Sequence, residues 1–347
     1  MNDVLATIRA KFTSLAVMGA ALFGATLAAP TAAQAEDFYK GKTVTIRVHT
    51  GPGGSNDFYA RAFARHLPNH IPGAPSVVVQ NMPGAGGKLL ANHIYRVAPK
   101  DGTAIGSLNQ TLGLDQLFSD GVEYDTGKFN WIARVVPTTG FVMVYHTAPT
   151  TTLEGMKTTE LIFGAQGKGS QTYMTPIIMR TLLGLKTKAV LGYSSSPEIY
   201  LAMERGELHA RTGAIETVLS SKPEWLTNGT LKIIGELSLE KESSMPGVPL
   251  LTSLVKDDES REIMELVASY TSLGISYALP PDVPAERVAA MRKAFMDTMA
   301  DQQFADEMGK SKMDIKPATG QEIQALATKF SGVSPDLVEK TKKALEW

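Results

Sequence analysis

The sequence predicts an α/β fold of two lobes, with two mixed or mostly parallel sheets flanked by helices and a hinge between the lobes. Three observations support this prediction. Strand and helix patterns alternate across short loops between residues 43 and 237. Glycine-rich loops follow the first two strand patterns, and the chain after residue 280 reads as helices. Such alternation is typical of parallel sheets covered on both faces.

The N-terminal third repeats a strand, loop and helix unit. Residues 43–49 are rich in β-branched side chains that alternate with other residues, and they lead into a glycine-rich turn. Asn56 or Asp57 is expected to cap the next helix, which Pro68 ends. The unit recurs as a strand at 76–80, a loop at 81–86 and a helix at 87–95, and a third strand is expected at 103–108.

The middle third continues this pattern. The apolar stretch 131–145 contains Pro137 and is expected to form two strands that meet at a bend. Further strands are expected at 161–165, 189–191, 209–212 and 231–237, and helices at 171–183 and 197–205. Pro176 lies inside the first of these helices and could mark its true start.

The last third is expected to form a strand at 270–279 and helices at 284–300, 302–308, 320–330 and 335–345. Four helices with so little sheet do not readily make a domain, so we expect them to cover the first lobe. Lobe 1 then comprises residues 36–137 and 269–347, and lobe 2 comprises residues 138–268. The two crossings near Pro137 and Ser269 form a hinge, as in proteins that close on a ligand.

Residues 1–35 resemble an export signal. Arg9 and Lys11 precede an apolar stretch, and Ala33, Gln34 and Ala35 form a small-x-small cleavage pattern. We expect cleavage after Ala35; the alternative, a membrane anchor, suits this stretch less well because its end is rich in Ala, Thr and Pro. The chain contains no cysteine, so it can form no disulfide and carry no lipid on a cysteine. An exported protein of this kind fits the bacterial periplasm.

Composition and motifs argue against several classes of function. The net charge is −1 without a basic cluster, which disfavours nucleic-acid binding. No Gly-x-Ser-x-Gly or His-Glu-x-x-His motif occurs, and Pro68 interrupts the pair His66 and His70, so we expect no catalytic residue, no metal and no cofactor. The glycine loops lack the Gly-Lys-Ser/Thr of a nucleotide-binding P-loop and carry Asn56 and Leu89 where a dinucleotide fingerprint needs glycine.

Two glycine-rich loops are the best candidates for a ligand site. Residues 51–57 and 81–87 both follow strands, and glycines there let backbone N–H groups approach an anion. Because strand ends of an open α/β sheet share one edge, both loops should line one crevice. Asp57 could touch the ligand or simply cap its helix.

In the second lobe, residues 167–170 offer the Ser170 hydroxyl and the Lys168 ammonium to an anion, although Lys168 could equally lie in a solvated turn. Tyr193 with Ser194, and Thr212, follow two other strands. His209 is interpreted as structural.

These segments resemble the Bug-type substrate-binding proteins of tripartite tricarboxylate transporters. The resemblance rests on Pro52, Gly53, Gly54 and Asp57 followed by Ala60 and Arg61, on the run 77–87, and on residues 98–102, with weaker matches at 206–208 and 248–250. It implies a periplasmic binding protein with a type II-like fold that delivers a small carboxylate to the large and small membrane subunits of a permease.

The resemblance also implies the ligand-binding residues, with the glycine loops of lobe 1 holding the ligand carboxylate and the loops of lobe 2 holding the distal part of the ligand. By position they are Gly53, Gly54, Ser55, Asp57, Gly84, Ala85, Gly86, Ser170, Gln171, Thr172, Tyr193 and Thr212. The sequence departs from the family pattern at Tyr173, at Ser194 and Ser195, and at His209, so the second lobe is expected to set a selectivity of its own.

The sequence therefore predicts a monomeric receptor without enzymatic activity, whose partners are a small carboxylate and the permease. Two alternatives remain open. One is an exported α/β enzyme that acts on a small carboxylate with Asp57 or His49, and the other is a receptor that feeds a membrane sensor.

Overall fold

The computed structural model describes residues 38–239, 241–242 and 245–347. The predicted export signal and its cleavage point lie outside these residues. Among the described residues, no helix combines the length and apolar character needed to cross a bilayer.

The first sheet has six strands in the order β11-β4-β10-β3-β1-β2. β1 pairs in parallel with β2 and β3, whereas β10 runs antiparallel to β3 and β4. The sheet is thus mixed, as predicted. Its strands are β1 (Thr43–Val48), β2 (Ser76–Asn81), β3 (Ala104–Leu108), β4 (Asn130–Val136), β10 (Ile275–Leu279) and β11 (Ala318–Thr319).

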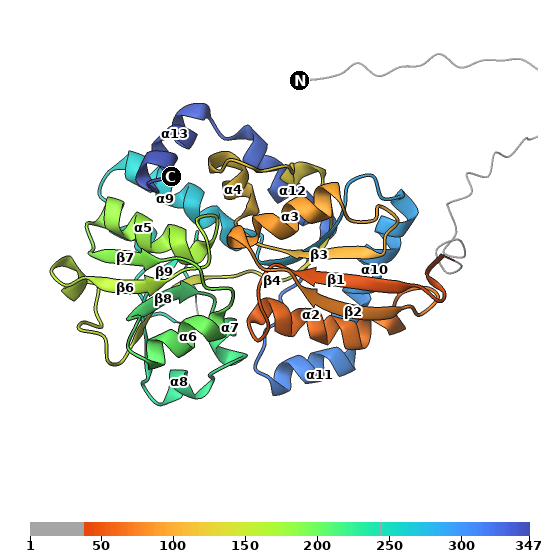
Figure 1. Ribbon diagram of the computed structural model, residues 1–347, viewed down its shortest axis with the longest axis horizontal. Helices are drawn as coiled ribbons and strands as arrows, with labels where there is room; N and C mark the ends of the chain where they lie inside the picture. The colour runs from red at the N-terminus through yellow and green to blue at the C-terminus, as the bar shows by residue number, and fades with distance from the viewer. Residues whose placement is uncertain (1–37, 240, 243–244) are drawn as a thin grey trace, which may run out of the picture. The chain divides into compact units, whose positions relative to one another are not determined.

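The second sheet has five strands in the order β7-β6-β8-β5-β9. β6 pairs in parallel with β7 and β8, and β5 runs antiparallel to β8 and β9. The strands are β5 (Gly140–Tyr145), β6 (Leu161–Gly164), β7 (Thr187–Val190), β8 (Ala210–Gly213) and β9 (Leu231–Leu237). The two sheets form the two lobes (Figure 1).

Helices cover both faces of each sheet (Figure 1). Around the first sheet lie α2 (Ser55–His66), α3 (Lys88–Arg96), α4 (Leu112–Phe118), α10 (Ala285–Ala300), α11 (Gln302–Lys310) and α12 (Gly320–Lys329). Around the second lie α5 (Gln171–Leu183), α6 (Ser196–Glu204), α7 (Glu216–Leu219), α8 (Glu224–Thr227) and α9 (Asp258–Ala268). The last helix, α13 (Pro335–Ala344), packs against α9, α5 and α4.

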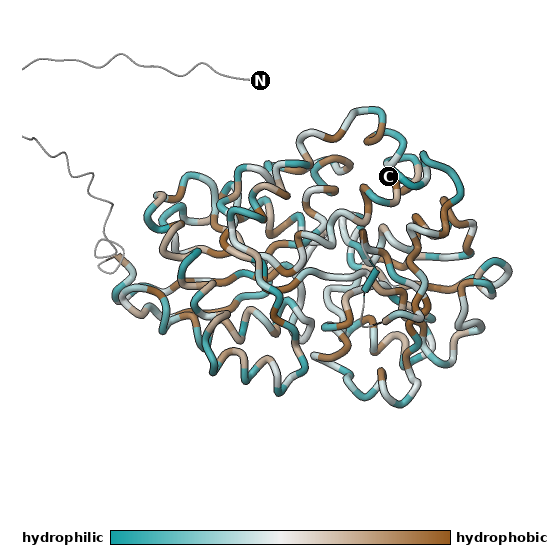
Figure 2. Tube along the Cα trace, turned by 180° about the vertical axis from the view of Figure 1, so that it is seen from behind, coloured by the Kyte–Doolittle hydropathy of each residue, from teal (hydrophilic) through white to brown (hydrophobic). Residues whose placement is uncertain are grey.

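Apolar packing fixes these layers. Phe63 of α2 stacks on Phe295 of α10 with ring centroids 4.6 Å apart, and both contact Tyr277 of β10. All three rings are fully buried, and burial of a large aromatic side chain contributes roughly 2–3 kcal/mol. Hydrophobic segments concentrate in the strands and inner helix faces (Figure 2). The first strands are therefore held rigidly, and their carboxyl ends present the glycine loops.

The structure differs from the predicted elements in several places. α4 and α9 are not predicted by the sequence pattern, and the predicted strand 270–279 is a strand only from Ile275, because the preceding residues form a 3-10 turn after α9. Gly54 is the N-cap of α2, so neither Asn56 nor Asp57 caps it; both lie in its first turn. α5 begins at Gln171 and contains Pro176 within it. α13 packs partly on helices of the second lobe rather than on the first alone.

Candidate functional site

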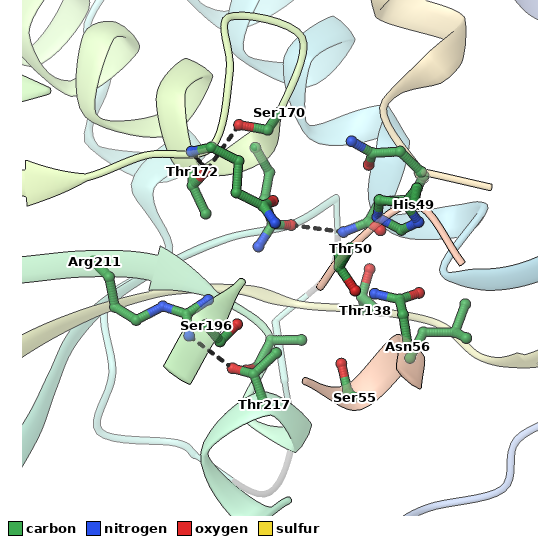
Figure 3. Close-up of a pocket in the computed structure, with 16 residues that line it drawn as sticks. His49, Thr50, Ser55, Asn56, Thr138, Ser170, Thr172, Ser196, Arg211 and Thr217 are labelled. Carbon is green, nitrogen blue, oxygen red and sulfur yellow. Dashed lines mark hydrogen bonds between the residues drawn. The ribbon is translucent and has the colours of Figure 1, made fainter. Parts of the chain in front are cut away.

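A polar cavity of about 40 Å³ lies between the two lobes at the carboxyl ends of the strands (Figure 3). His49, Thr50, Ser55 and Asn56 reach it from the first lobe, and Ser170, Ser196 and Arg211 from the second. This volume holds a few waters or a group as small as a carboxylate. We refer to it as the inner cavity. It is lined by His49, Thr50, Ser55, Asn56, Asn109, Gln110, Thr138, Gln166, Ser170, Gln171, Thr172, Ser196, Arg211, Ala214, Thr217 and Ile275.

Three helices begin at this cavity. α2 contributes Ser55 and Asn56, α5 contributes Gln171 and Thr172, and α6 contributes Ser196. No side chain of the N-cap residues Gly54, Ser170 and Ser195 bonds to the first turn of its helix. The first-turn N–H groups and the partial positive charge of three helix N-termini therefore converge on one small volume, which favours an anion.

Arg211 supplies the full positive charge of the cavity. It lies on β8 and is 2% exposed, and its guanidinium donates hydrogen bonds to the Tyr200 hydroxyl at 2.7 Å and to Thr217 Oγ1 at 3.2 Å. It also donates to the Thr212 carbonyl at 3.3 Å. Within the part of the chain that the structure describes, Arg211 forms no ion pair, and no Asp or Glu lines the cavity. An uncompensated buried charge of this kind needs a counter-ion.

A second cavity of about 220 Å³ adjoins the first, because His49 and Gln166 line both. It is formed by residues 83–87 of the second glycine loop and by Gly192, Tyr193 and Ser194. It is more apolar than the inner cavity and contains no charged side chain. We refer to it as the outer cavity, which can accept the body of a ligand whose charged group lies further in.

Asp57 holds the two glycine loops together. Its carboxylate accepts hydrogen bonds from Gly53 N at 3.0 Å, Asn81 Nδ2 at 2.9 Å and Arg61 Nε at 2.9 Å. Asn81 Nδ2 also donates to the Thr50 carbonyl at 2.9 Å. Burial opposes ionisation of Asp57, but these hydrogen bonds outweigh it and hold the pKa of the carboxyl below its usual range. The Asp57 side chain therefore fixes the positions of the two loops relative to each other.

The lobes touch directly around the cavities. Gly51 N donates to Ser194 O at 2.9 Å, Ser221 Oγ donates to Gly53 O at 2.6 Å, and Gln110 Nε2 donates to Gln171 Oε1 at 2.9 Å. Residues 84–87 meet residues 167–170 so closely that a Cβ on Gly86 would lie 3.0 Å from Ser170 N. The lobes are therefore in contact on several sides of the inner cavity, whereas Gly84, Ala85 and Gly192 at the outer cavity are exposed.

The residues predicted to bind ligand fall into three groups. Four line the inner cavity: Ser55, Ser170, Gln171 and Thr172. Four line the outer cavity: Gly84, Ala85, Gly86 and Tyr193. Four line neither: Gly53, Gly54, Asp57 and Thr212. Thr212 is fully buried, and its Oγ1 donates to the Gln171 carbonyl at 3.2 Å, so it orients the start of α5.

Lys168 and His209 do not take part in the site. Lys168 is exposed and lines neither cavity. His209 Nδ1 accepts a hydrogen bond from Ile162 N at 3.1 Å, a contact between neighbouring strands that agrees with the structural interpretation. The described residues contain no group of three or more His, Asp or Glu placed to hold a metal.

Sequence reasoning missed several of the lining residues. The most informative is Arg211, since a charged residue inside the strand 209–212 is a signal that can be read from sequence. Asn109, Gln110 and Thr138 carry no such signal, because polar residues at strand ends are common. His49 was considered only as a catalytic base.

Known proteins resemble this chain in sequence and in fold. Residues 60–342 match the sequence model of the tripartite tricarboxylate transporter family receptor. The chain belongs to this family. Protein BugT of Bordetella pertussis is 27% identical over 253 residues, which cover 69% of this chain and 73% of BugT. The sequence-based recognition of the family is therefore confirmed, and this chain is a solute-binding receptor of the tripartite tricarboxylate transporter type.

Solved structures confirm the two-lobed fold of this receptor. The periplasmic binding protein BugD superimposes with a TM-score of 0.70 at 19% identity, covering 88% of this chain and 98% of BugD. MatC of Rhodopseudomonas palustris, solved with bound malate, gives a TM-score of 0.66 at 18% identity and covers 86% of this chain and 99% of MatC. Family members are periplasmic binding proteins rather than enzymes.

Proposed function

We propose that this receptor binds a small organic carboxylate between its lobes and delivers it to the membrane subunits of a tripartite transporter. The observation that carries the proposal is Arg211: a buried guanidinium without an ion pair among the described residues, facing a cavity at which α2, α5 and α6 begin. In the free protein this charge is costly, because several kcal/mol are lost when an ion is buried unpaired. A ligand carboxylate recovers that energy.

The contacts between the lobes support a closing mechanism. The chain passes from β4 to β5 through residues 137–139 and returns through residues 269–274. We place the hinge in these two segments, with residues 36–137 and 269–347 forming one lobe and residues 138–268 the other. The closed lobes bury the carboxylate, and the permease recognises this form. The receptor acts as a monomer in the periplasm, after its export signal has been removed by cleavage after Ala35.

Binding without catalysis is favoured by the state of the two residues that an enzyme would use. The Asp57 carboxylate already accepts three hydrogen bonds, from Gly53 and Asn81 of the two loops and from Arg61 of α2. His49 is neutral at physiological pH, since burial lowers its pKa to about 4. Among the described residues, the His49 side chain forms a hydrogen bond only with the Ser107 carbonyl oxygen, so it makes no nucleophile–base pair with a Ser or Thr of the inner cavity.

A thermal-shift screen of carboxylates on the purified receptor, followed by calorimetry, tests this function. A ligand that binds the folded state raises the melting temperature in proportion to RT ln(1 + [L]/Kd). We expect at least one small carboxylate to bind with a Kd in the micromolar range or below, without turnover. Product formation on prolonged incubation would overturn the proposal, and so would binding that persists unchanged in Arg211→Met.

A further inference from the structure

His49 occupies the junction of the inner and outer cavities with its ring orientation fixed. It follows the last residue of β1, is 5% exposed, and its Nδ1 lies 3.0 Å from the Ser107 carbonyl oxygen. A carbonyl oxygen can only accept a hydrogen bond, so Nδ1 must be the protonated nitrogen. In the neutral ring, Nε2 is then a hydrogen-bond acceptor with a free lone pair.

The Nε2 lone pair has no hydrogen-bond partner among the described residues. His49 lines both cavities, and a Cβ on Gly87 would lie 3.4 Å from Cδ2, the ring carbon bonded to Nε2. The acceptor edge therefore faces the glycine loop where the cavities join. Asn56 Oδ1, in the first turn of α2, also lines the inner cavity, and this atom is buried without a hydrogen-bond partner.

The side chains of the two lobes differ in what they offer a ligand. The second lobe contributes a cation, Arg211, whereas the first lobe contributes two acceptors, His49 Nε2 and Asn56 Oδ1, beside the N–H groups at the start of α2. A ligand that carries only carboxylate oxygens leaves these acceptors unsatisfied. A buried acceptor without a donor weakens binding, and sites built around such a group discriminate strongly against analogues that lack the donor.

The donor on the ligand could be a hydroxyl or an ammonium, and the charges of the site distinguish them. Of the described residues, no Asp or Glu lines either cavity, and the positive ends of α2, α5 and α6 lie at the inner one. An ammonium group would therefore have no negatively charged side chain beside it. A hydroxyl group is uncharged and needs no countercharge, so the site favours a hydroxyl.

We propose that His49 Nε2 accepts a hydrogen bond from a hydroxyl group of the ligand, so that this receptor selects hydroxycarboxylates over the corresponding deoxy acids. This inference rests on the proposed carboxylate-binding function and names the group that sets its specificity. His49 acts on the ligand directly, beside the carboxylate contact made by Arg211.

Calorimetry with matched acids tests the assignment. The pairs are malate and succinate, citrate and tricarballylate, and lactate and propionate, with aspartate and alanine as amino analogues. For at least one pair we expect the hydroxy acid to bind roughly 10- to 100-fold more tightly than its deoxy partner, and the amino analogue to bind no better than the deoxy acid. Equal affinities within every pair that binds, or a preference for the amino analogue, would overturn the assignment.

Two variants separate this inference from the proposed function. His49→Leu should reduce the hydroxy-to-deoxy ratio to about one while the deoxy acid still binds. Arg211→Met should weaken both members of a pair together. If Arg211→Met leaves the affinity for both acids unchanged, the proposed carboxylate site is wrong. If Arg211→Met weakens binding but His49→Leu leaves the hydroxy-to-deoxy affinity ratio unchanged, only the assignment of His49 is wrong.

A spectroscopic measurement keeps the test valid should His49→Leu fold poorly. The ¹⁵N resonance of an unprotonated Nε2 shifts when its lone pair accepts a hydrogen bond. In the wild-type protein we expect this shift for His49 on addition of the tighter hydroxy acid and not on addition of its deoxy partner. A resonance that moves equally with both acids would contradict the proposal.

Discussion

The Arg211 guanidinium donates from Nη1 to the Tyr200 hydroxyl at 2.7 Å, and its central carbon lies 5.0 Å from the centroid of the same ring. Tyr200 is fully buried on α6, and its hydroxyl lies 3.1 Å from Thr217 Oγ1. The ring and the two hydroxyls orient the cation without neutralising it. Arg211 therefore keeps its charge available for a ligand.

Replacing Arg211 by Met should abolish tight carboxylate binding without destabilising the free protein. A charge-assisted hydrogen bond contributes about 1.5–3 kcal/mol, so the loss of two predicts at least a 100-fold weaker Kd. Unfolding by urea in the absence of ligand should require the same or a higher free energy, because an unpaired buried charge is removed and Tyr200 and Thr217 can still bond to each other. Arg205→Met, at an exposed position, is the matched control and should change neither quantity.

Gly54→Asp should strengthen α2 and eliminate anion binding. Gly54 is the N-cap of α2 in an extended conformation, where Asp is a favoured residue, so folding should be retained. The new carboxylate would occupy the first-turn N–H groups and repel a ligand anion, which should weaken the Kd by at least 100-fold. Gly54→Ser introduces an uncharged capping residue and should lose much less ligand affinity. Equal affinity of the Asp and Ser variants, measured by calorimetry, would show that α2 does not contact the ligand.

Gly86→Ala should hinder closure of the lobes. Gly86 has a φ of +68°, and an added Cβ would lie 3.0 Å from Ser170 N and 3.1 Å from Gly169 C, both backbone atoms of the opposite lobe. Gly121→Ala is the control, since Gly121 has a φ of +69° but open space around its Cβ position. Both variants share the backbone strain of roughly 1 kcal/mol, and only the first adds the clash.

We therefore expect Gly86→Ala to bind ligand roughly 10-fold more weakly than Gly121→Ala, with a larger radius of gyration by X-ray scattering in the presence of ligand. Matching affinities and radii would mean that the loops at Gly86 and Ser170 do not meet in the closed form.

The stability of the protein should depend on the ionisation of Glu216. This side chain is 8% exposed at the start of α7, and burial, with help from the Asp314 and Glu242 carboxylates, raises its pKa to about 7. A carboxyl whose pKa is raised on folding favours the folded state fully below its unfolded value near pH 4.5, and that advantage is lost as the pH rises through 7. By pH 8 the loss amounts to roughly 3 kcal/mol.

Glu216→Gln, which resembles the protonated acid, checks this expectation. Its free energy of unfolding in urea should lie within about 1 kcal/mol of the wild-type value at pH 5 and exceed it by roughly 3 kcal/mol at pH 8. Glu224→Gln, at an exposed position on α8, is the control and should follow the wild type at both pH values. A constant difference between Glu216→Gln and wild type from pH 5 to 8 would exclude ionisation of Glu216 as the cause.

Most of the fold could be predicted because its signals are local. The β-branched runs at 43–48 and 76–81 form β1 and β2, and the glycine loops after them lie at one edge of the sheet, as parallel pairing requires. α9 was not predicted although Asp257 caps it, and residues 270–274 were assigned to a strand because Tyr270 and Thr271 are residue types that strands favour, whereas residues 269–272 form a 3-10 turn. Short apolar runs do not distinguish strand from helix by periodicity.

The candidate site could be predicted only in part. The glycine loops and the start of α5 are visible in the sequence because glycine runs, and Ser170 after Gly169, directly follow predicted strands. His49 and Arg211 were not assigned to ligand binding, since their meaning depends on which side of a strand faces the opposite lobe. The role of Asp57 likewise could not be read from the sequence, because it depends on hydrogen bonds from Arg61 and Asn81.

The sequence by itself determined the α/β class, the two glycine loops at adjacent strand ends and membership of the receptor family, because these follow from periodicity and from residues close together in the chain. Only the tertiary structure decided that Arg211 is buried without an ion pair among the described residues, that three helices begin at the same cavity, and that His49 lies at the junction of the two cavities. Those properties arise from burial and from groups more than a hundred residues apart, and burial is what converts ordinary polar side chains into a selective site.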